Sequence, residues 1–307
     1  MNDSDYISEY QTENDALYKR IERATSEILR MVLIGKSGSG KSETGNALLG
    51  QKKFKADISA SSVTQSCECK AGSLFGQKVL ITDTPGIFDP TARIDDTQIE
   101  IAKFIDLTLP GPHVLLFVLR VGRLTQEDAD TLVKFKEQFG GAVEDYLVVV
   151  FTHCSELRKR QTSEEEFIQT AKTAIPMFQK LKNRFVFLEH DPDYPPIEQD
   201  NQLKKLLDVV QRVQRENGDT CYSNDMYETR LAEIQEQKLR EEEERREKKR
   251  KKEEDRNREL EKARQEGQKE MREMLEQNTK ILSNVSLSKN QLLKRKKLFW
   301  RNRDSKY

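Results

Sequence analysis

The sequence predicts an α/β fold in which a mostly parallel sheet is flanked by helices on both faces and is followed by a long charged helix. A glycine-rich loop stands between an apolar run and a helix-forming segment within residues 29–49. Apolar runs of strand length then alternate with helical segments as far as residue 215, a pattern typical of a parallel sheet covered by helices. Residues 238–264 hold 13 basic and 10 acidic residues among 27, which predicts a solvated helix.

The glycine-rich loop has the spacing of a phosphate-binding loop, Gly35-x-x-x-x-Gly40-Lys41-Ser42, and it follows the apolar residues 31–34. Its glycines allow backbone N–H groups to point at one centre, and the N-terminus of the next helix adds partial positive charge there. Lys41 would reach the β- and γ-phosphates, and the Ser42 hydroxyl would hold Mg²⁺. The predicted nucleotide-binding residues here are Gly35, Lys36, Ser37, Gly38, Ser39, Gly40, Lys41, Ser42 and Glu43.

A second motif, Asp-Thr-Pro-Gly at residues 83–86, follows the predicted third strand at 78–82. An Asp in this place holds Mg²⁺ through water in phosphate-loop NTPases, and the Gly86 amide can meet a γ-phosphate. In the Ser-rich loop before the second strand, Thr64 either gives Mg²⁺ its hydroxyl when a γ-phosphate is present or is one of several solvated hydroxyls. The two motifs predict a nucleoside triphosphate with Mg²⁺, and the predicted metal ligands are Ser42, Thr64 and Asp83.

The remaining elements follow from apolar runs, helix caps and turn residues. Continuous apolar runs at 113–120 and 146–152 predict strands buried on both faces. Ser or Thr before an amphipathic pattern predicts a helix start, and Gly or Pro predicts its end. We also expect strands at 66–70 and 184–188, a turn at 71–77, a second switch at 87–96, and helices at 97–109, at 125–139, from 162 or 163 to a break near 176, and at 197–215.

Length and composition indicate one sizeable domain with an appendage. Charged residues make up 35% of the 307 residues, and the mean hydropathy is −0.81, too polar for one compact core throughout. The 53 basic residues balance 53 acidic ones, so net charge indicates no partner. We expect an N-terminal extension at residues 1–26, a nucleotide-binding domain at 27–217, and a charged helix with a basic tail at 218–307.

Cysteine spacing and apolar runs bear on the compartment. The four cysteines form no Cys-x-x-Cys pair and no disulfide-like framework, which is typical of reduced thiols. The first ten residues are polar and acidic and do not resemble a secretory signal, and the longest apolar runs are far shorter than a membrane span. We therefore expect a cytoplasmic protein.

Five segments lie within a stretch that runs from about residue 28 to residue 227. Four of them read GKSGSGKSETGNALLG, SVTQSC, DTPGIFD and GPHVLLFVLRVGRLTQED, and the fifth is residues 221–227. This stretch resembles the GTPases of immunity-associated proteins (GIMAP), which are relatives of septins and of plant chloroplast import receptors. The resemblance implies a Ras-like G domain that binds GTP or GDP with Mg²⁺. It further implies dimerisation across the nucleotide face, as a homodimer or with a family member, often on intracellular membranes.

The base-reading positions depart from the family pattern. Residues 152–155 read Thr-His-Cys-Ser, so a hydroxyl at Ser155 replaces the carboxylate that would accept two hydrogen bonds from guanine. A hydrogen bond to a charged group contributes about 1.5–3 kcal/mol, which a hydroxyl does not match. Residues 189–190 read Glu-His instead of an asparagine pair. Either guanine selectivity is lost, or Glu156 or Glu189 supplies a replacement carboxylate. The predicted residues at the base end are Thr152, His153, Ser155, Glu189 and His190.

Two positions bear on hydrolysis. Ile87 stands where Ras-like hydrolases carry a glutamine that orients the attacking water, so rapid intrinsic hydrolysis is not expected. Arg123 matches a position from which some family members insert an arginine across the dimer, where it would neutralise charge in the transition state. Arg123 is therefore the predicted catalytic residue, and the alternative is a surface arginine before a helix cap.

The appendage has three parts. No apolar residue occurs between Leu239 and Leu260, so a coiled-coil seam is missing there, and Glu-to-basic pairs four residues apart favour a solvated spacer helix. The apolar residues of 271–282 either meet a partner or fold back. The tail at 291–307 interleaves basic and apolar residues, which fits either an anionic membrane surface or a disordered charged end. We expect no nucleic-acid partner.

Three functions remain open at this point. The first is a switch that binds Mg-GTP and dimerises, with slow or dimer-dependent GTP hydrolysis. The second is a degenerate G domain that acts as a scaffold. The third is an NTP-binding protein with relaxed base choice. The Ser155 position and the Glu-His pair at 189–190 are the features that separate them.

Overall fold

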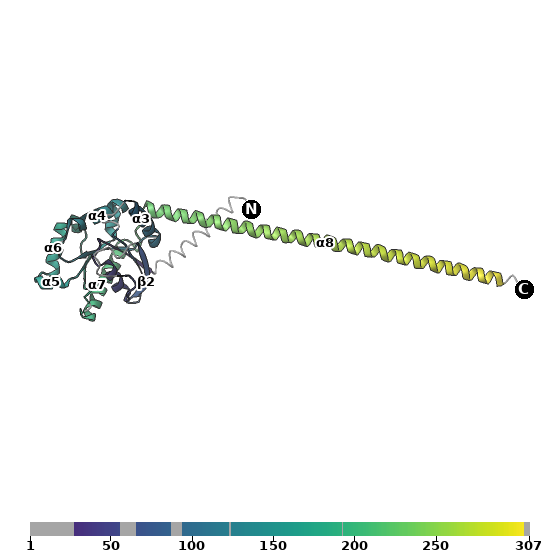
Figure 1. Ribbon diagram of the computed structural model, residues 1–307, viewed down its shortest axis with the longest axis horizontal. Coiled ribbons are helices and arrows are strands. Elements are labelled where there is room, and N and C mark those ends of the chain that lie inside the picture. The colour runs from purple at the N-terminus through teal and green to yellow at the C-terminus, as the bar shows by residue number, and fades with distance from the viewer. Residues whose placement is uncertain (1–27, 56–65, 87–93, 123, 192, 304–307) are drawn as a thin grey trace. The chain divides into compact units, whose positions relative to one another are not determined.

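The computed structural model describes residues 28–55, 66–86, 94–122, 124–191 and 193–303. The chain divides into two units, Met1–Ile234 and Gln235–Tyr307. The first unit holds the sheet and the predicted site, and the described part of the second is helix (Figure 1).

Six strands form one sheet in the first unit. All neighbouring strands are parallel except for one antiparallel pair at the edge, β2 with β3. The α/β class with a mostly parallel sheet is therefore confirmed, and the strand order is that of a Ras-like G domain. In the order β2-β3-β1-β4-β5-β6, the strands are β2 (Glu68–Leu74), β3 (Gln77–Asp83), β1 (Ile28–Ile34), β4 (Val114–Arg120), β5 (Leu147–Thr152) and β6 (Phe185–Leu188).

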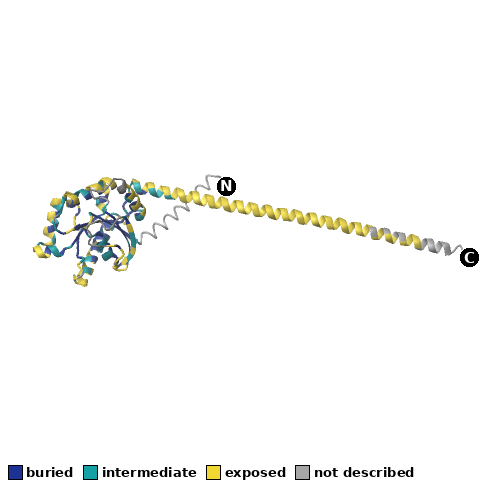
Figure 2. Cartoon of the chain, in the orientation of Figure 1, coloured by how far each residue is buried: buried dark blue, intermediate teal, exposed yellow. Residues whose placement is uncertain are grey.

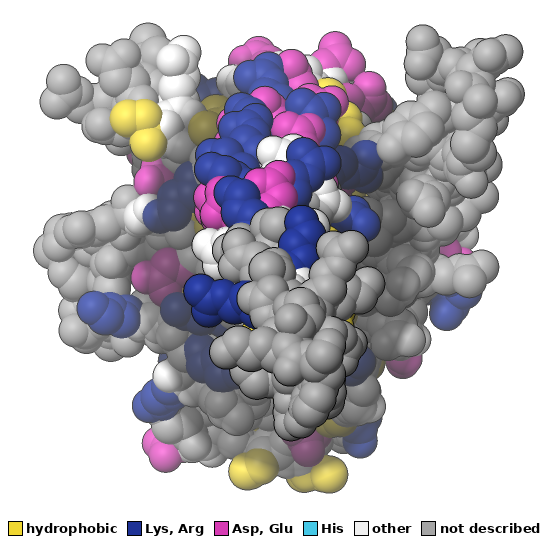
Figure 3. All heavy atoms as spheres, turned by 90° about the vertical axis from the view of Figure 1, so that its right-hand side faces the viewer, with side chains coloured by type: hydrophobic (Ala, Val, Ile, Leu, Met, Phe, Trp, Pro, Cys, Tyr) yellow, Lys and Arg dark blue, Asp and Glu magenta, His cyan; other side chains and the backbone are white. Residues whose placement is uncertain are grey.

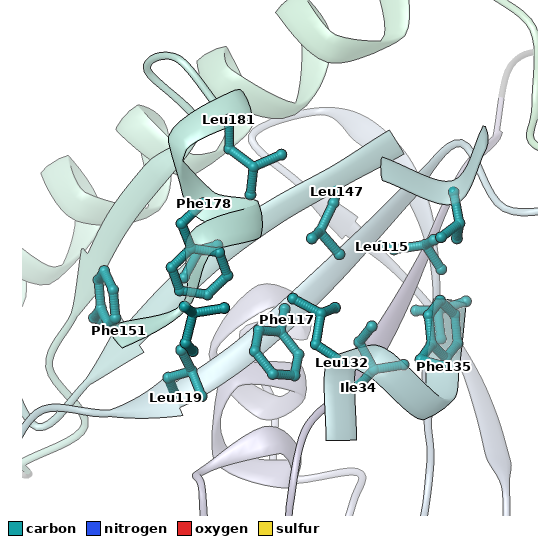
Figure 4. Packing of buried hydrophobic residues seen from close by; sticks show 14 of the residues in the cluster. Ile34, Leu115, Phe117, Leu119, Leu132, Phe135, Leu147, Phe151, Phe178 and Leu181 are labelled. Atoms are coloured by element: carbon teal, nitrogen blue, oxygen red, sulfur yellow. The ribbon is translucent and has the colours of Figure 1, made fainter. Parts of the chain in front are cut away.

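Helices cover both faces of this sheet, because alternate strand residues point to opposite faces. Ile34 and Phe117 belong to one buried cluster (Figure 4), while their neighbours Leu33 and Val118 belong to a second. Buried residues concentrate along the sheet and on the inner sides of the helices (Figure 2). The first cluster is covered by α3 (Ile94–Thr108), α4 (Gln126–Phe139), α6 (Glu164–Ala174) and the 3₁₀ turns η1 (Gly141–Tyr146) and η2 (Pro176–Lys180), and the second by α2 (Lys41–Leu49) and α7 (Pro196–Glu216).

The prediction for the second strand and its turn was wrong. The strand β2 continues to Leu74, through residues expected to form a turn, and pairs with β3 along its length. The reversal needs only Phe75 and Gly76, which have φ angles of 47° and 88°. Two consecutive residues with positive φ give the tight hairpin turn whose twist matches that of paired strands.

The first unit extends past the predicted domain end at residue 217, to Ile234. Tyr222 and Tyr227 are fully buried beyond that point. The Tyr222 amide donates to the Pro112 carbonyl at 2.8 Å, and the Tyr227 hydroxyl lies 2.6 Å from the hydroxyl of Thr108. Both aromatic side chains complete the cluster under α3 and α4, so this short segment is part of the folded domain.

The helix α8 (Asp225–Arg303) confirms the long C-terminal charged helix. Every side chain described between residues 235 and 295 is exposed, and basic and acidic groups stand next to one another on its surface (Figure 3). Ion pairs four residues apart, such as Glu247–Lys251 at 2.8 Å, stabilise such a helix in water. Among the described residues, no helix combines the length and apolarity needed to cross a bilayer. The membrane contact expected of the basic tail stays a prediction.

His113, which precedes β4, makes the stability of the first unit depend on pH. Its Nδ1 accepts the Arg30 amide at 3.0 Å and must be unprotonated to do so. Burial, and then the Arg30 guanidinium, lower the pKa of His113 from 6.5 to about 4. As the pH falls from 6.5 towards 4, the unfolded chain takes up a proton that the folded chain does not, so stability falls by up to about 3 kcal/mol.

We therefore expect the unfolding free energy to decrease between pH 7 and pH 4.5, with a shallower decrease in His113→Asn. The asparagine oxygen can accept the Arg30 amide but takes up no proton in this range. Urea titrations at a series of pH values measure the two slopes. Equal slopes in the wild type and the variant would show that His113 is not the group responsible.

Candidate nucleotide site

The phosphate loop lies at the carboxyl end of β1, between β3 and β4, where the topology also brings the ends of the neighbouring strands. Gly35 has a φ of 144°, and a Cβ there would lie 2.4 Å from the Val118 carbonyl oxygen. Gly40 has a φ of 94° and precedes α2, and a Cβ there would press on Thr152. A side chain would clash at Gly35 and would be strained by the positive φ at Gly40, so glycine allows the loop to pass close under the ends of β4 and β5.

Lys41 opens α2 and is buried under the loop. Its ammonium group donates to the carbonyls of Gly35 at 3.0 Å and Lys36 at 2.9 Å. The cation is thus held beside the backbone amides of the loop and the helix N-terminus, the combination that binds phosphate in such loops. The buried hydroxyl of Ser39 has no hydrogen-bond partner among the described residues, so a polar group in this loop is left available to a ligand.

Ser42 and Asp83, the two described residues that were predicted to hold Mg²⁺, are in direct contact. The Ser42 hydroxyl donates to Asp83 Oδ2 at 2.6 Å, although the residues are 41 positions apart. Thr84, directly after Asp83, is buried and donates its hydroxyl to the Leu33 carbonyl at 2.7 Å, which fixes the end of β3 against β1. A hydroxyl and a carboxylate are oxygen ligands of the kind Mg²⁺ takes, so the pair fits the ion. Thr64, the third predicted ligand, lies outside the described residues.

Two further predicted residues are placed as follows. Gly86 follows the carboxyl end of β3, the end of the parallel strands at which the phosphate loop also lies, and it is partly exposed. Arg123, the predicted catalytic arginine, lies outside the described residues. Its neighbour Thr125 caps α4, in a capping box with Asp128.

Lys36 connects the phosphate loop to that cap, a contact the sequence pattern did not indicate. Its ammonium group lies 3.2 Å from Asp128 and 3.0 Å from the Thr125 hydroxyl. The side chain of Asp128 is only 4% exposed, and its Oδ2 also accepts the Thr125 amide at 2.9 Å. The pair thus holds the start of α4 against the loop that would carry the phosphates.

We expect Lys36 and Asp128 to be energetically coupled. Lys36→Met and Asp128→Asn should each destabilise the fold, and the double variant should lose about 1–3 kcal/mol less than the two together. The cause is that each single change leaves the partner without its opposite charge in a poorly solvated place. Urea unfolding of the four proteins gives the coupling energy. The exposed pair Lys205–Glu164 is the matched control, with an expected coupling below about 1 kcal/mol.

The base end of the site lies after β5 and β6. Thr152 is buried and donates its hydroxyl to the Ser39 carbonyl at 2.8 Å, so it supports the phosphate loop. His153 has a φ of 58° and lies 3.1 Å from the Thr152 hydroxyl. Burial, and then the charge of Arg120, lower the pKa of His153, so its ring is neutral at pH 7. Ser155 follows and begins the short helix α5 (Ser155–Arg160), which the sequence reasoning missed.

Glu189 accepts hydrogen bonds from the backbone of two segments at this end of the site. It is 2% exposed; its Oε2 accepts the Ser155 amide at 2.6 Å, and its Oε1 accepts the amides of His190 at 2.9 Å and Asp191 at 3.2 Å. Burial alone would raise the pKa of Glu189, but the hydrogen bonds from these amides outweigh it and lower the pKa. Both oxygens of the carboxylate therefore bind the protein's own backbone: Oε2 caps the start of α5, and Oε1 holds the turn after β6.

His190 and Glu156 have different surroundings. The Nε2 atom of His190 lies 3.0 Å from the Thr44 hydroxyl on α2, and burial, followed by the neighbouring His153, lowers the pKa of His190 to about 4. Two neutral imidazoles thus stand at the base end near pH 7. Glu156, the other candidate for a replacement carboxylate, pairs with Lys159 at 2.8 Å on the outer side of α5.

Comparison with known proteins identifies the family. The AIG1 family profile matches residues 29–243, which is more than half of the chain and includes every predicted site residue. The chain belongs to the AIG1 family. The predicted resemblance to GIMAP proteins is thereby confirmed.

Named relatives agree with this assignment. The chain is 33% identical over 202 residues to immune-associated nucleotide-binding protein 12 of Arabidopsis thaliana, covering 65% of this chain and 51% of that protein. It is 31% identical over 186 residues to human GTPase IMAP family member 8, covering 61% of this chain and 27% of that protein. The chain therefore spans about half and about a quarter of these relatives. A crystal structure of Arabidopsis thaliana Toc33 with GDP and Mg²⁺ is similar at 19% identity and a TM-score of 0.47, over 66% of this chain and 92% of that chain.

Proposed function

We propose that this AIG1-family chain is a nucleotide-dependent switch that binds Mg-GTP at the phosphate loop and then dimerises across its nucleotide face. The observation that carries the proposal is the convergence of Lys41, Ser42 and Asp83, a buried ammonium group beside a hydroxyl–carboxylate pair. These are the groups that hold the phosphates and Mg²⁺ in phosphate-loop NTPases. The names of two relatives, a nucleotide-binding protein and a GTPase, support the same ligand class.

Hydrolysis in this proposal is slow or depends on the dimer. Ile87 replaces the glutamine that orients water in Ras-like enzymes, so the monomer lacks one expected catalytic group. Arg123 from the partner subunit would supply positive charge to the transition state, as the GIMAP resemblance implies. An Arg123→Ala variant that dimerises and hydrolyses GTP at the wild-type rate would remove Arg123 from this proposal.

A second candidate, an NTP-binding protein with relaxed base choice, is favoured by one observation. The buried carboxylate at the base end, Glu189, accepts three backbone amides, and Ser155 carries no carboxylate. Recognition of guanine by a carboxylate would therefore require Glu189 to exchange its own hydrogen bonds. Stacking on neutral His153 or His190 would not distinguish guanine from adenine strongly, because every base offers a π-face.

Calorimetric titration of the full chain with Mg-GTP, Mg-GDP and Mg-ATP separates these functions. Tight binding of GTP with weak binding of ATP supports the switch. Equal affinities for GTP and ATP support relaxed base choice and contradict guanine selectivity. Heat from none of the three nucleotides contradicts both and supports a scaffold.

A further inference from the structure

The distal part of α8 carries an apolar stripe that the nucleotide site does not explain. Eight large apolar side chains between residues 271 and 293 are 52–69% exposed. The preceding stretch from 240 to 259 has no apolar residue at all. The stripe belongs entirely to the second unit, 235–307, and its residues are Met271, Met274, Leu275, Ile281, Leu282, Val285, Leu292 and Leu293.

The stripe repeats every seven residues. Met271, Val285 and Leu292 stand in one column, whose remaining position is Asn278. Met274 and Ile281 form a second column, three residues after the first, whose next position is Ser288. Leu275 and Leu282 border this column, and Leu293 lies outside the columns. The columns correspond to positions a, d and e of a heptad. A strict repeat of seven drifts around a straight helix, and two helices that wrap around each other with a left-handed twist keep such a repeat in contact.

The polar and charged residues of this segment favour a protein partner over a membrane. Between residues 271 and 293, Arg272, Lys280 and Lys289 are nearly balanced by Glu273 and Glu276, so this segment, unlike the basic tail after it, would gain little electrostatic attraction to anionic lipid. Asn278 stands in the middle of the apolar stripe. In lipid its amide would lose hydrogen bonds to water, whereas in a two-stranded coiled coil the amides of two copies bond each other across the seam.

These features identify the partner as a second copy of the same segment. An asparagine at a single a position specifies the register and favours two parallel strands. We propose that residues 271–293 pair with the same residues of a second copy of this chain as a parallel two-stranded coiled coil. This pairing needs no nucleotide, so it is independent of the proposed switch.

Disulfide trapping in the full chain tests the parallel register. Val285→Cys places a thiol at a seam position, where it faces its own counterpart in the second copy. Ser283→Cys, two residues away on the opposite side of the helix, is the matched control. Both are made in a Lys41→Ala background and oxidised without nucleotide by copper-phenanthroline, and the cross-linking of the parent with its four native cysteines is subtracted. Cross-linked dimer from Val285→Cys at several times the control level is expected. Equal yields would overturn the parallel pairing.

Sedimentation equilibrium without nucleotide tests whether the stripe binds a second copy of the chain. We expect the wild type to dimerise, Ile281→Lys to be monomeric at the same concentration, and Ser283→Lys, which adds the same charge outside the seam, to dimerise as the wild type does. Asn278→Leu should broaden the distribution towards higher oligomers, because the polar restriction at the seam is lost. A wild type that stays monomeric overturns the proposal. If this monomeric wild type floats with phosphatidylserine vesicles and the Ile281→Lys variant does not, the stripe binds a membrane.

Discussion

Replacing Lys41 with alanine is expected to weaken binding of Mg-GTP by about a hundredfold or more and thereby to abolish GTP-dependent dimerisation. The Lys41 ammonium group is buried at the centre of the phosphate loop, where it donates to the carbonyls of Gly35 and Lys36. Two charge-assisted bonds to phosphate oxygens contribute about 3–6 kcal/mol together, so their loss weakens binding by about a hundredfold or more. Calorimetry measures the affinity, and sedimentation with and without GTP measures the dimerisation.

A control separates loss of the ligand from loss of the fold. Lys52 is an exposed lysine just beyond α2, and Lys52→Ala should bind and dimerise like the wild type. The Lys41→Ala protein should keep the circular dichroism of the wild type, because its loop glycines and the sheet are unchanged. If this variant still dimerises normally on addition of GTP, the switch mechanism is wrong.

Replacing Tyr227 with alanine is expected to destabilise the first unit by about 3–5 kcal/mol, a large part of the stability of a typical domain. The ring is fully buried and packs 6.2 Å from the Tyr222 ring, so its removal leaves a cavity beneath α3. Urea unfolding followed by tyrosine fluorescence measures the change.

Tyr227→Phe is the matched control for the Tyr227 prediction. It keeps the ring and removes only the contact with the Thr108 hydroxyl, so a loss of about 1–3 kcal/mol is expected. An alanine variant as stable as the wild type would show that the start of α8 is not part of the folded domain. The predicted domain end at residue 217 would then be adequate for truncation.

The parts of the fold that follow from local pattern could be predicted from the sequence. The runs at β4 and β5 are apolar up to their last residues, Arg120 and Thr152, because both faces of a central strand are buried, and this is visible in sequence. The edge strand β2 carries Gly72 and Ser73, which also occur in turns, so its length could not be read locally. Its pairing with β3 and its contact with α2 decide the outcome, and the Leu49 side chain of α2 packs directly over Gly72.

In the candidate site, too, the features that depend on local sequence could be predicted, and the features that depend on distant contacts could not. The phosphate loop is one continuous segment with fixed spacing, so Lys41 and Ser42 could be recognised directly. The contact between Lys36 and Asp128 joins positions 92 apart and depends on how β4 leads into α4. The role of Glu189 also depends on topology, because β5 and β6 are neighbours and end side by side. Sequence reasoning identified Glu189 as a possible reader of the base, and the structure shows it capping α5.

The contacts of Glu189 restrict which side chains the base end can accept at position 155. An aspartate there would place a new carboxylate at a residue whose amide already binds the buried Glu189 side chain. Two carboxylates this close repel each other, so that single step would weaken the turn that shapes the base end. An acidic side chain at position 155 is therefore expected to need a compensating change at Glu189.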